Sequence, residues 1–169
     1  MHRRCSAHVH GFTLVELLVA VVIIGILAAI GVPSFQALMD KKRLEGAVDN
    51  VLADLRYAQS ESVKQNVDIT VKDFEEGINW QYEFHPPLTV GAGASGASYK
   101  GTSMAVFTAS KVITFEAKRS TVSQAPTSGS LKAIELTSAN GLKLGIEIDA
   151  GSRMGICTSS AVAGYPSCP

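Results

Sequence analysis

The feature that most restricts this chain is an apolar run near its N-terminus. Residues Phe12 to Val32 read FTLVELLVAVVIIGILAAIGV, 21 residues with a single charge. A helix rises about 1.5 Å per residue, so a helix of this length spans the roughly 30 Å hydrocarbon layer of a membrane. The run predicts a membrane-spanning helix over residues 12–33, and the compact part of the chain is therefore smaller than 169 residues suggest.

The residues before this run, MHRRCSAHVHG, form a short basic leader over residues 1–11. In a secretory signal peptide the cleavage site follows a shorter apolar core, whereas here the polar segment stops before the apolar run begins. A cut at this junction leaves the helix attached to the mature chain. A lipoprotein signal is set aside because Cys5 precedes the apolar run. Basic residues flank both ends, so charge alone leaves the membrane orientation open.

Glu16 is the unusual residue of the apolar run. A carboxylate inside a membrane-spanning segment costs about 2.5–3.5 kcal/mol on insertion scales, and such residues usually have a partner. No cation lies one helical turn away in the sequence. Two interpretations remain from the residues alone: Glu16 reaches the headgroups from near the end of the segment, or a group from another molecule neutralises it.

The hexapeptide GFTLVE at residues 11–16 resembles the prepilin processing motif of type IV pilins and type II secretion pseudopilins. The resemblance implies that prepilin peptidase cuts after Gly11 and that the new N-terminal residue, Phe12, is N-methylated. It also implies that Glu16 pairs with the N-terminal amine of a neighbouring subunit and so sets the stagger between subunits.

Gly25 and Pro33 weaken the helix near the end of the apolar run. By its chemistry, Pro33 either kinks the helix or opens a new one at its first turn. The resemblance to pilins implies that the segment from Gly25 to Pro33 loses helical order in the assembled filament.

A second, amphipathic helical segment is predicted over residues 34–66. Its apolar residues recur at steps of four and three, which is typical of one helix face: Leu44, Val48, Val51, Leu55 and Ala58. No second long helix follows, so we expect strands to cover this face. A coiled-coil seam is the weaker alternative, because the stripe covers barely two heptads.

Residues 67–169 read as a β-rich head. Alternating patterns predict strands around Val67–Val71 and Trp80–Phe84 with a turn at 76–79, another at Lys111–Phe115, and a hairpin of 132–138 with 142–148 through Asn140-Gly141. The glycine-rich segment 86–103 reads as a long exposed loop. We therefore expect an α+β fold, in which the long helix packs on one antiparallel sheet.

Catalytic and metal-binding signals are weak. After removal of the leader, His85 is the remaining histidine, and a solvated loop histidine is more common than a general base, so we expect neither a metal site nor a cofactor. The adjacent acids Glu75 and Glu76 read as solvated surface, and the aromatic stripe of residues 80–84 reads as core rather than a ligand-stacking face. We expect a protein that is not an enzyme.

The three cysteines become one pair when the leader is removed. Cys157 and Cys168, in an exported segment, fit a disulfide in an oxidising compartment, with two free thiols as the weaker alternative. Closing a loop of this size stabilises a small domain by about 3 kcal/mol.

The motif, the helix, the sheet domain and a cysteine in the last strand together resemble the GspH/FimT branch of pilin-like proteins. The resemblance implies a low-copy minor pilin that is placed near the filament tip and begins assembly with other minor and major pilins. The chain would sit in the inner membrane with a periplasmic head and then enter a cell-surface pilus. A minor pseudopilin of a type II secretion system, forming a periplasmic pseudopilus, is an alternative.

A second alternative is uptake of double-stranded DNA. DNA-binding FimT proteins carry Gly-Arg-x-Arg shortly before the cysteine of the last strand, and the aligned residues here are Ser152, Arg153, Met154 and Gly155. Only the first arginine is present, and residues 67–169 hold eight Lys or Arg against nine Asp or Glu, so no general positive field attracts DNA. Arg153 either contacts phosphate with help from Lys143 or pairs with a nearby acid.

Overall fold

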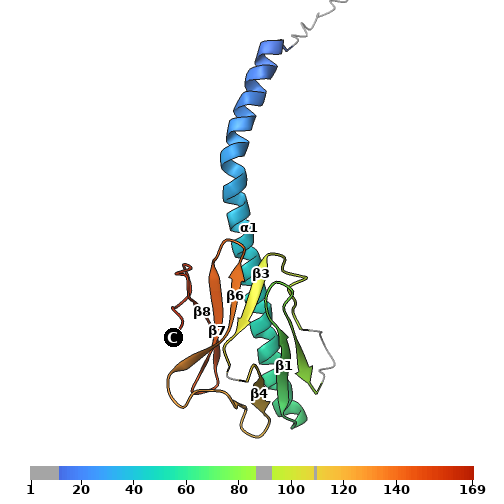
Figure 1. Cartoon of the computed structure of the whole chain (residues 1–169), viewed down its shortest axis with the longest axis vertical. Coiled ribbons are helices and arrows are strands. Elements are labelled where there is room, and N and C mark those ends of the chain that lie inside the picture. The colour runs from blue at the N-terminus through green and yellow to red at the C-terminus, as the bar shows by residue number, and fades with distance from the viewer. Residues whose placement is uncertain (1–11, 87–92, 109) are drawn as a thin grey trace, which may run out of the picture. The chain divides into compact units, whose positions relative to one another are not determined.

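The structure, a computed structural model, describes residues 12–86, 93–108 and 110–169. The predicted leader, including Gly11, lies outside the described residues. The chain divides between Ala37 and Leu38 into two compact units, and one helix, α1 (Leu14–Gln65), runs through the division. Figure 1 shows α1 and the strands that follow it.

The first turn of α1 is closed by reciprocal hydrogen bonds between Thr13 and Glu16. The Glu16 backbone N–H donates to Thr13 Oγ1 at 3.2 Å, and the Thr13 backbone N–H donates to the Glu16 carboxylate at 3.0 Å. This arrangement is a capping box, which satisfies donors that the helix itself leaves unpaired. At the other end, Asn66 adopts a left-handed conformation (φ 53°), and the N–H of Val67 returns to Ser62 O.

Pro33 lies inside α1 rather than at the start of a new helix. The interpretation in which Pro33 opens a second helix is therefore wrong for the single chain. The expected loss of helical order between Gly25 and Pro33 concerns the assembled filament and stays a prediction.

The apolar stripe predicted on the second half of α1 is confirmed. Its five members have no exposed surface: Leu44, Val48, Val51, Leu55 and Ala58. They share one hydrophobic core with the strands of this same chain. The chain thus covers the stripe itself, as expected of packing inside a domain, and the coiled-coil alternative is wrong.

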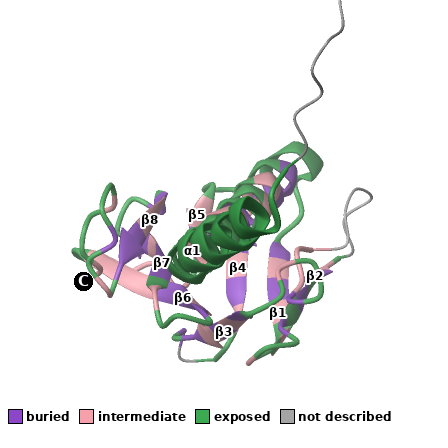
Figure 2. Ribbon diagram, turned by 90° about the horizontal axis from the view of Figure 1, so that it is seen from above, coloured by how far each residue is buried: buried purple, intermediate pink, exposed green. Residues whose placement is uncertain are grey.

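The strands of the head form two antiparallel sheets, not the single sheet expected. One has the order β2-β1-β4-β5 and the other β3-β6-β7-β8. Their bounds are β1 (Ile69–Glu75), β2 (Gln81–His85), β3 (Thr102–Val106), β4 (Ile113–Glu116), β5 (Thr121–Val122), β6 (Ser130–Ser138), β7 (Lys143–Asp149) and β8 (Met154–Thr158). In Figure 2 the strands of both sheets carry buried segments.

Both predicted hairpins are present. β1 pairs with β2 across the turn at residues 76–79, and β6 pairs with β7 through Asn140-Gly141, where Gly141 takes the positive φ that this turn needs. Trp80, Tyr82 and Phe84 are buried, so the aromatic stripe is core, as predicted.

The segment expected to be an open loop, residues 86–103, is partly packed. Residues 87–92 lie outside the described residues, but Tyr99 stacks on Trp80 with ring centroids 6.2 Å apart, and the Gly96 N–H donates to Trp80 O at 2.8 Å. A Cβ at Gly96 would lie 2.2 Å from the carbonyl oxygen of Ile78. The glycine therefore permits a close backbone approach, and Thr102 already begins β3.

The C-terminal tail is fastened to the end of β8. Cys157 and Cys168 form the disulfide that the sequence predicts. The Thr158 N–H donates to Pro166 O at 2.7 Å, and the Cys168 N–H donates to Thr158 O at 3.0 Å. Gly145, opposite Cys157 on β7, leaves room for the bridge, because a Cβ there would lie 3.1–3.2 Å from both sulfurs.

Candidate functional site

The N-terminal unit exposes its apolar side chains on every side. All of its described residues, 12–37, are exposed, although the run has a mean hydropathy of 2.9 over its most apolar window. By length and composition, this helix is able to cross a membrane. Such a surface needs lipid or other apolar helices around it.

Glu16 is the single ionisable side chain in the sequence from Phe12 to Ala37. Its carboxylate accepts hydrogen bonds from the N–H and the hydroxyl of Thr13, at 3.0 and 2.9 Å. These bonds orient the carboxylate at the first turn of α1 but supply no positive charge. Within residues 12–37 no side chain supplies a counter-charge to Glu16.

Three arginines surround an open groove on the head. Arg56 comes from α1, Arg119 from the turn between β4 and β5, and Arg153 from the residue before β8. We call this feature the arginine groove; it has a volume of about 680 Å³. Its other lining residues are uncharged: Gln59, Ser120, Thr121, Gly151, Ser152 and Met154. No acidic side chain lines the groove within the described residues.

Hydrogen bonds from α1 to the loops fix the walls of the arginine groove. The Arg56 guanidinium donates to Met154 O at 2.9 Å, and Gln59 donates to Ser120 O at 2.9 Å. The buried Ser152 hydroxyl accepts from the Val122 N–H at 2.9 Å, which holds the turn before β8 against β5. These bonds hold α1, the turn between β4 and β5, and the turn before β8 together around the groove.

Arg153 makes the acid pair that the sequence analysis named as one interpretation. Its Nε lies 2.8 Å from Asp149 Oδ2, and its side chain remains 86% exposed. Hydrogen bonds from the backbone N–H and guanidinium of Arg153 lower the pKa of Asp149. The pair leaves the outer face of the guanidinium open to a ligand.

Lys143 does not lie near Arg153. It starts β7, whereas Arg153 lies beside the other end of that strand, about 20 Å away for seven residues of strand. Lys143 Nζ is 3.4 Å from Glu135, which Lys132 and Ser159 also contact. Burial opposes ionisation of Glu135, but the hydrogen bonds from Lys132 and Ser159 outweigh it and lower its pKa. Lys143 and Arg153 therefore do not share one site, and a part for Lys143 in DNA binding stays a prediction.

The adjacent acids of the first turn differ in role. Both Glu75 and Glu76 are exposed, as expected, and Glu76 also accepts a hydrogen bond from the Val106 N–H at 2.8 Å and pairs with Lys111 at 2.6 Å. The hydrogen bond from Lys111 lowers the pKa of Glu76. Glu76 therefore links the turn between β1 and β2 to β3, and these acids do not form a paired acid–base site.

A capped apolar helix with one acid in its first turn, continuing into a head of two antiparallel sheets, defines the class of pilin-like subunits. Residues 6–32 match the model described as the prokaryotic N-terminal methylation motif, and residues 47–160 match the model described as type II transport protein GspH. No solved structure matched the chain. The chain belongs to the GspH family, and is thus a membrane-anchored pilin or pseudopilin that is later assembled into a filament.

Two members of the arginine groove were not predicted from the sequence. Arg56 and Arg119 are 63 positions apart, and neither belongs to a motif in the sequence. Only the packing of α1 beside the turns of both sheets brings them to Arg153. No spacing rule in the sequence connects the three.

Proposed function

We propose that this chain is a minor pilin of a type IV pilus, cut by prepilin peptidase after Gly11 and incorporated near the filament tip, where it helps to start assembly with other minor and major pilins. Before assembly it is anchored in the inner membrane with its head in the periplasm. The observation that supports this proposal most is the N-terminal unit, in which Glu16 is the one charge on a fully exposed apolar helix. The corresponding role in a secretion pseudopilus rests on the same observation.

The proposed cut would supply a counter-charge for Glu16. Removal of the leader creates an ammonium group on Phe12, and methylation of that nitrogen keeps the charge. When apolar helices pack side by side, a carboxylate and an ammonium from neighbouring subunits neutralise each other only in one axial register. Any other register leaves two charges unpaired in an apolar surrounding, so Glu16 selects the stagger.

We predict that Glu16→Gln and Glu16→Ala leave the chain in the membrane but reduce its incorporation into filaments at least about tenfold, the effect of losing 1.4 kcal/mol or more of pairing. Glutamine retains an acceptor for the Thr13 N–H, so its failure isolates the charge from the capping box. The measurement is the ratio of this chain in sheared filaments to that in membranes, by immunoblot.

Thr13→Val is the matched control. It removes the hydroxyl that caps α1, at a cost of about 1 kcal/mol in helix stability, but keeps the carboxylate of Glu16. We expect near-normal incorporation. Wild-type incorporation of Glu16→Gln, or a mature chain that keeps Met1 by mass spectrometry, contradicts the proposal.

The arginine groove favours a second candidate function, the binding of duplex DNA phosphates. Three guanidinium groups around one groove with no acidic lining residue among those described are suited to a phosphate backbone. From the sequence this function ranks second because the motif holds one arginine, and the groove supplies two more.

A salt titration of DNA binding by the full chain in detergent tests this candidate. If the groove binds phosphates, Arg56→Ala and Arg119→Ala should each weaken binding and lower the slope of log affinity against log salt by about 1. Arg43→Ala, a change in an arginine paired with Asp40 on α1, should leave the slope unchanged. If the parent chain and the three variants give the same salt dependence, any DNA binding belongs to surfaces outside the groove.

A further inference from the structure

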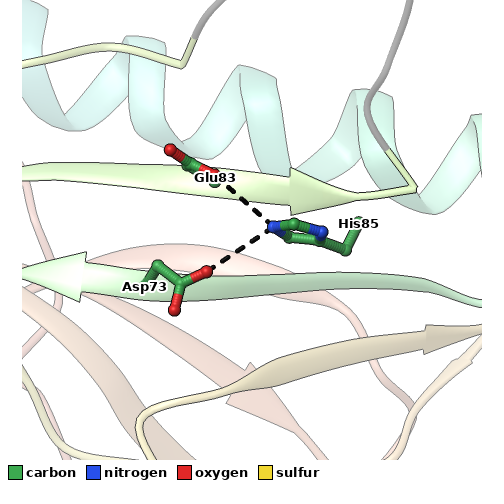
Figure 3. A group of neighbouring side chains, drawn as sticks. All are labelled: Asp73, Glu83 and His85. Carbon is green, nitrogen blue, oxygen red and sulfur yellow. Dashed lines mark ion pairs between the residues drawn. The ribbon is translucent and has the colours of Figure 1, made fainter.

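A histidine and two carboxylates meet on the outer face of the first sheet. His85 Nε2 lies 3.5 Å from Asp73 Oδ2 and 3.5 Å from Glu83 Oε2, and the three ligand atoms all lie within 4.8 Å of one another. Figure 3 shows the imidazole edge pointing between the two carboxylates. The residues come from β1 and the edge strand β2.

The strand register explains how β2 supplies two of these groups. Lys72 lies opposite Glu83 and Thr70 opposite His85, so Glu83 and His85 share the face that points away from buried Tyr82 and Phe84. Two ligands separated by one residue on a strand thus lie on the same side without any further constraint.

A β-bulge supplies the third group. In a regular ladder Asp73 would lie opposite Tyr82 and point toward the core. The register instead shifts between Lys72 and Glu75, and Asp73 adopts a positive φ of 55°. Phe74 takes the place beside Tyr82, with ring centroids 5.8 Å apart, and the Asp73 carboxylate turns outward to His85.

One nitrogen of the His85 imidazole lacks a hydrogen-bond partner within the described residues. This atom, Nε2, is buried, although it faces two carboxylate oxygens and the side chain as a whole is 41% exposed. A separation of 3.5 Å is too long for a good N–H···O bond. It agrees with the edge of a tetrahedron around Zn²⁺, about 3.3–3.6 Å for bonds of 2.0–2.2 Å. The corresponding edge for octahedral Mg²⁺ is about 2.9 Å.

We propose that Asp73, Glu83 and His85 bind one Zn²⁺ ion, with the fourth position open to solvent. One imidazole and two carboxylates are ligands that zinc accepts, whereas Ca²⁺ and Mg²⁺ prefer all-oxygen sites. The carboxylates are 60% and 67% exposed, so they are free to rotate inward and the ion has a path from solvent. Lys72 Nζ, 3.7 Å from Asp73 Oδ2, is displaced toward water on binding.

The bound ion would join edge strand β2 to the bulge of β1. It would replace contacts between a neutral or protonated imidazole and two acids with three metal–ligand bonds. This proposal is independent of the filament role, because none of its residues belongs to the N-terminal unit or to the arginine groove.

The test is zinc binding to the full chain, purified in detergent without a histidine tag, against a fluorescent zinc indicator. Every sample carries Cys5→Ser and His2, His8 and His10→Ala, so that the leader contributes no ligands. We expect one Zn²⁺ per chain and a loss of affinity of at least about tenfold in His85→Ala, because changing residues that merely orient a ligand already costs about 10–100-fold. Asp73→Asn and Glu83→Gln should weaken binding similarly, and Asn tolerates the positive φ.

Glu75→Gln is the matched control, since Glu75 is an exposed acid of the same strand outside the cluster. It should bind zinc like the parent chain. Circular-dichroism melts with a chelator show whether each variant folds. If His85→Ala does not fold, Glu83→Gln still tests the proposal. Bound Co²⁺ should give the strong visible absorption of a four-coordinate site. Parental affinity in His85→Ala and Glu83→Gln, an equal loss in Glu75→Gln, or binding of Ca²⁺ in preference to Zn²⁺ overturns the proposal.

Discussion

Replacing Trp80 with alanine is expected to lower the free energy of unfolding of the head by about 3–5 kcal/mol, the usual cost of deleting a buried large aromatic side chain. Trp80 has no exposed surface. Its indole N–H donates to Thr102 Oγ1 at 3.1 Å, and its ring stacks on Tyr99. One side chain thus joins the hairpin of the first sheet, the glycine-rich segment and β3 of the second sheet.

Chemical denaturation of the full chain in detergent, followed by circular dichroism, measures this loss. Trp80→Phe keeps most of the apolar volume but leaves Thr102 without its donor, so it should cost about 1–3 kcal/mol. Ile78→Ala is the control, because Ile78 lies two residues away and is 69% exposed. It should change stability by less than about 0.5 kcal/mol. A loss below 1 kcal/mol in Trp80→Ala would show that the two sheets do not depend on this contact.

The parts of the fold that were predictable from sequence are those set by local periodicity. The stripe from Leu44 to Ala58 identified the buried face of α1, and Asn140-Gly141 identified the β6–β7 hairpin. In both cases neighbouring residues carry the whole signal: the period of a helix in one, the positive φ of a turn in the other.

Long-range pairing was not predictable in the same way. Alternation of apolar and polar residues identifies a strand but not the strand with which it pairs. It therefore does not show that β1 pairs with β4, or that β3 pairs with β6 in a second sheet. The segment before β3 was misread as an exposed loop because its composition, rich in Gly, Ala and Ser, is typical of unpacked segments. Gly96 in fact allows the backbone to approach the Ile78 carbonyl closely. This contact depends on the position of Trp80, whose carbonyl accepts the Gly96 N–H.

The candidate sites follow the same division. The N-terminal motif is contiguous, so its resemblance to the prepilin motif assigns expected roles to Gly11, Phe12 and Glu16 from adjacent residues alone. The arginine groove and the Asp73–Glu83–His85 cluster each join residues from different elements, and the second requires a bulge that reverses the direction of one side chain. The expectation of no metal site rested on the single histidine of the mature chain, whereas the proposed zinc site also uses two carboxylates that the fold brings to it.

Removal of the Cys157–Cys168 disulfide is expected to lower the free energy of unfolding by about 3 kcal/mol, since the cross-link limits the unfolded chain over a sequence separation of 11. The folded tail also depends on it. Backbone hydrogen bonds of Thr158 to Pro166 O and from the Cys168 N–H hold the returning tail, but these two bonds involve a single residue of β8 and compete with water. We therefore expect the tail to open in the Cys157→Ser, Cys168→Ser double variant while both sheets persist.

Hydrogen exchange resolves the local effect from the global one. Amides of Ser159 to Cys168 should exchange much faster in the double variant, whereas those of β6 and β7 should change only by the loss in global stability. Reduction of the parent chain should give the same pattern, and Cys5→Ser should give none. Because Gly145 packs directly under both sulfurs, uniform acceleration through β7 and the tail would mean instead that the bridge stabilises the sheet itself, and that the tail is part of its core.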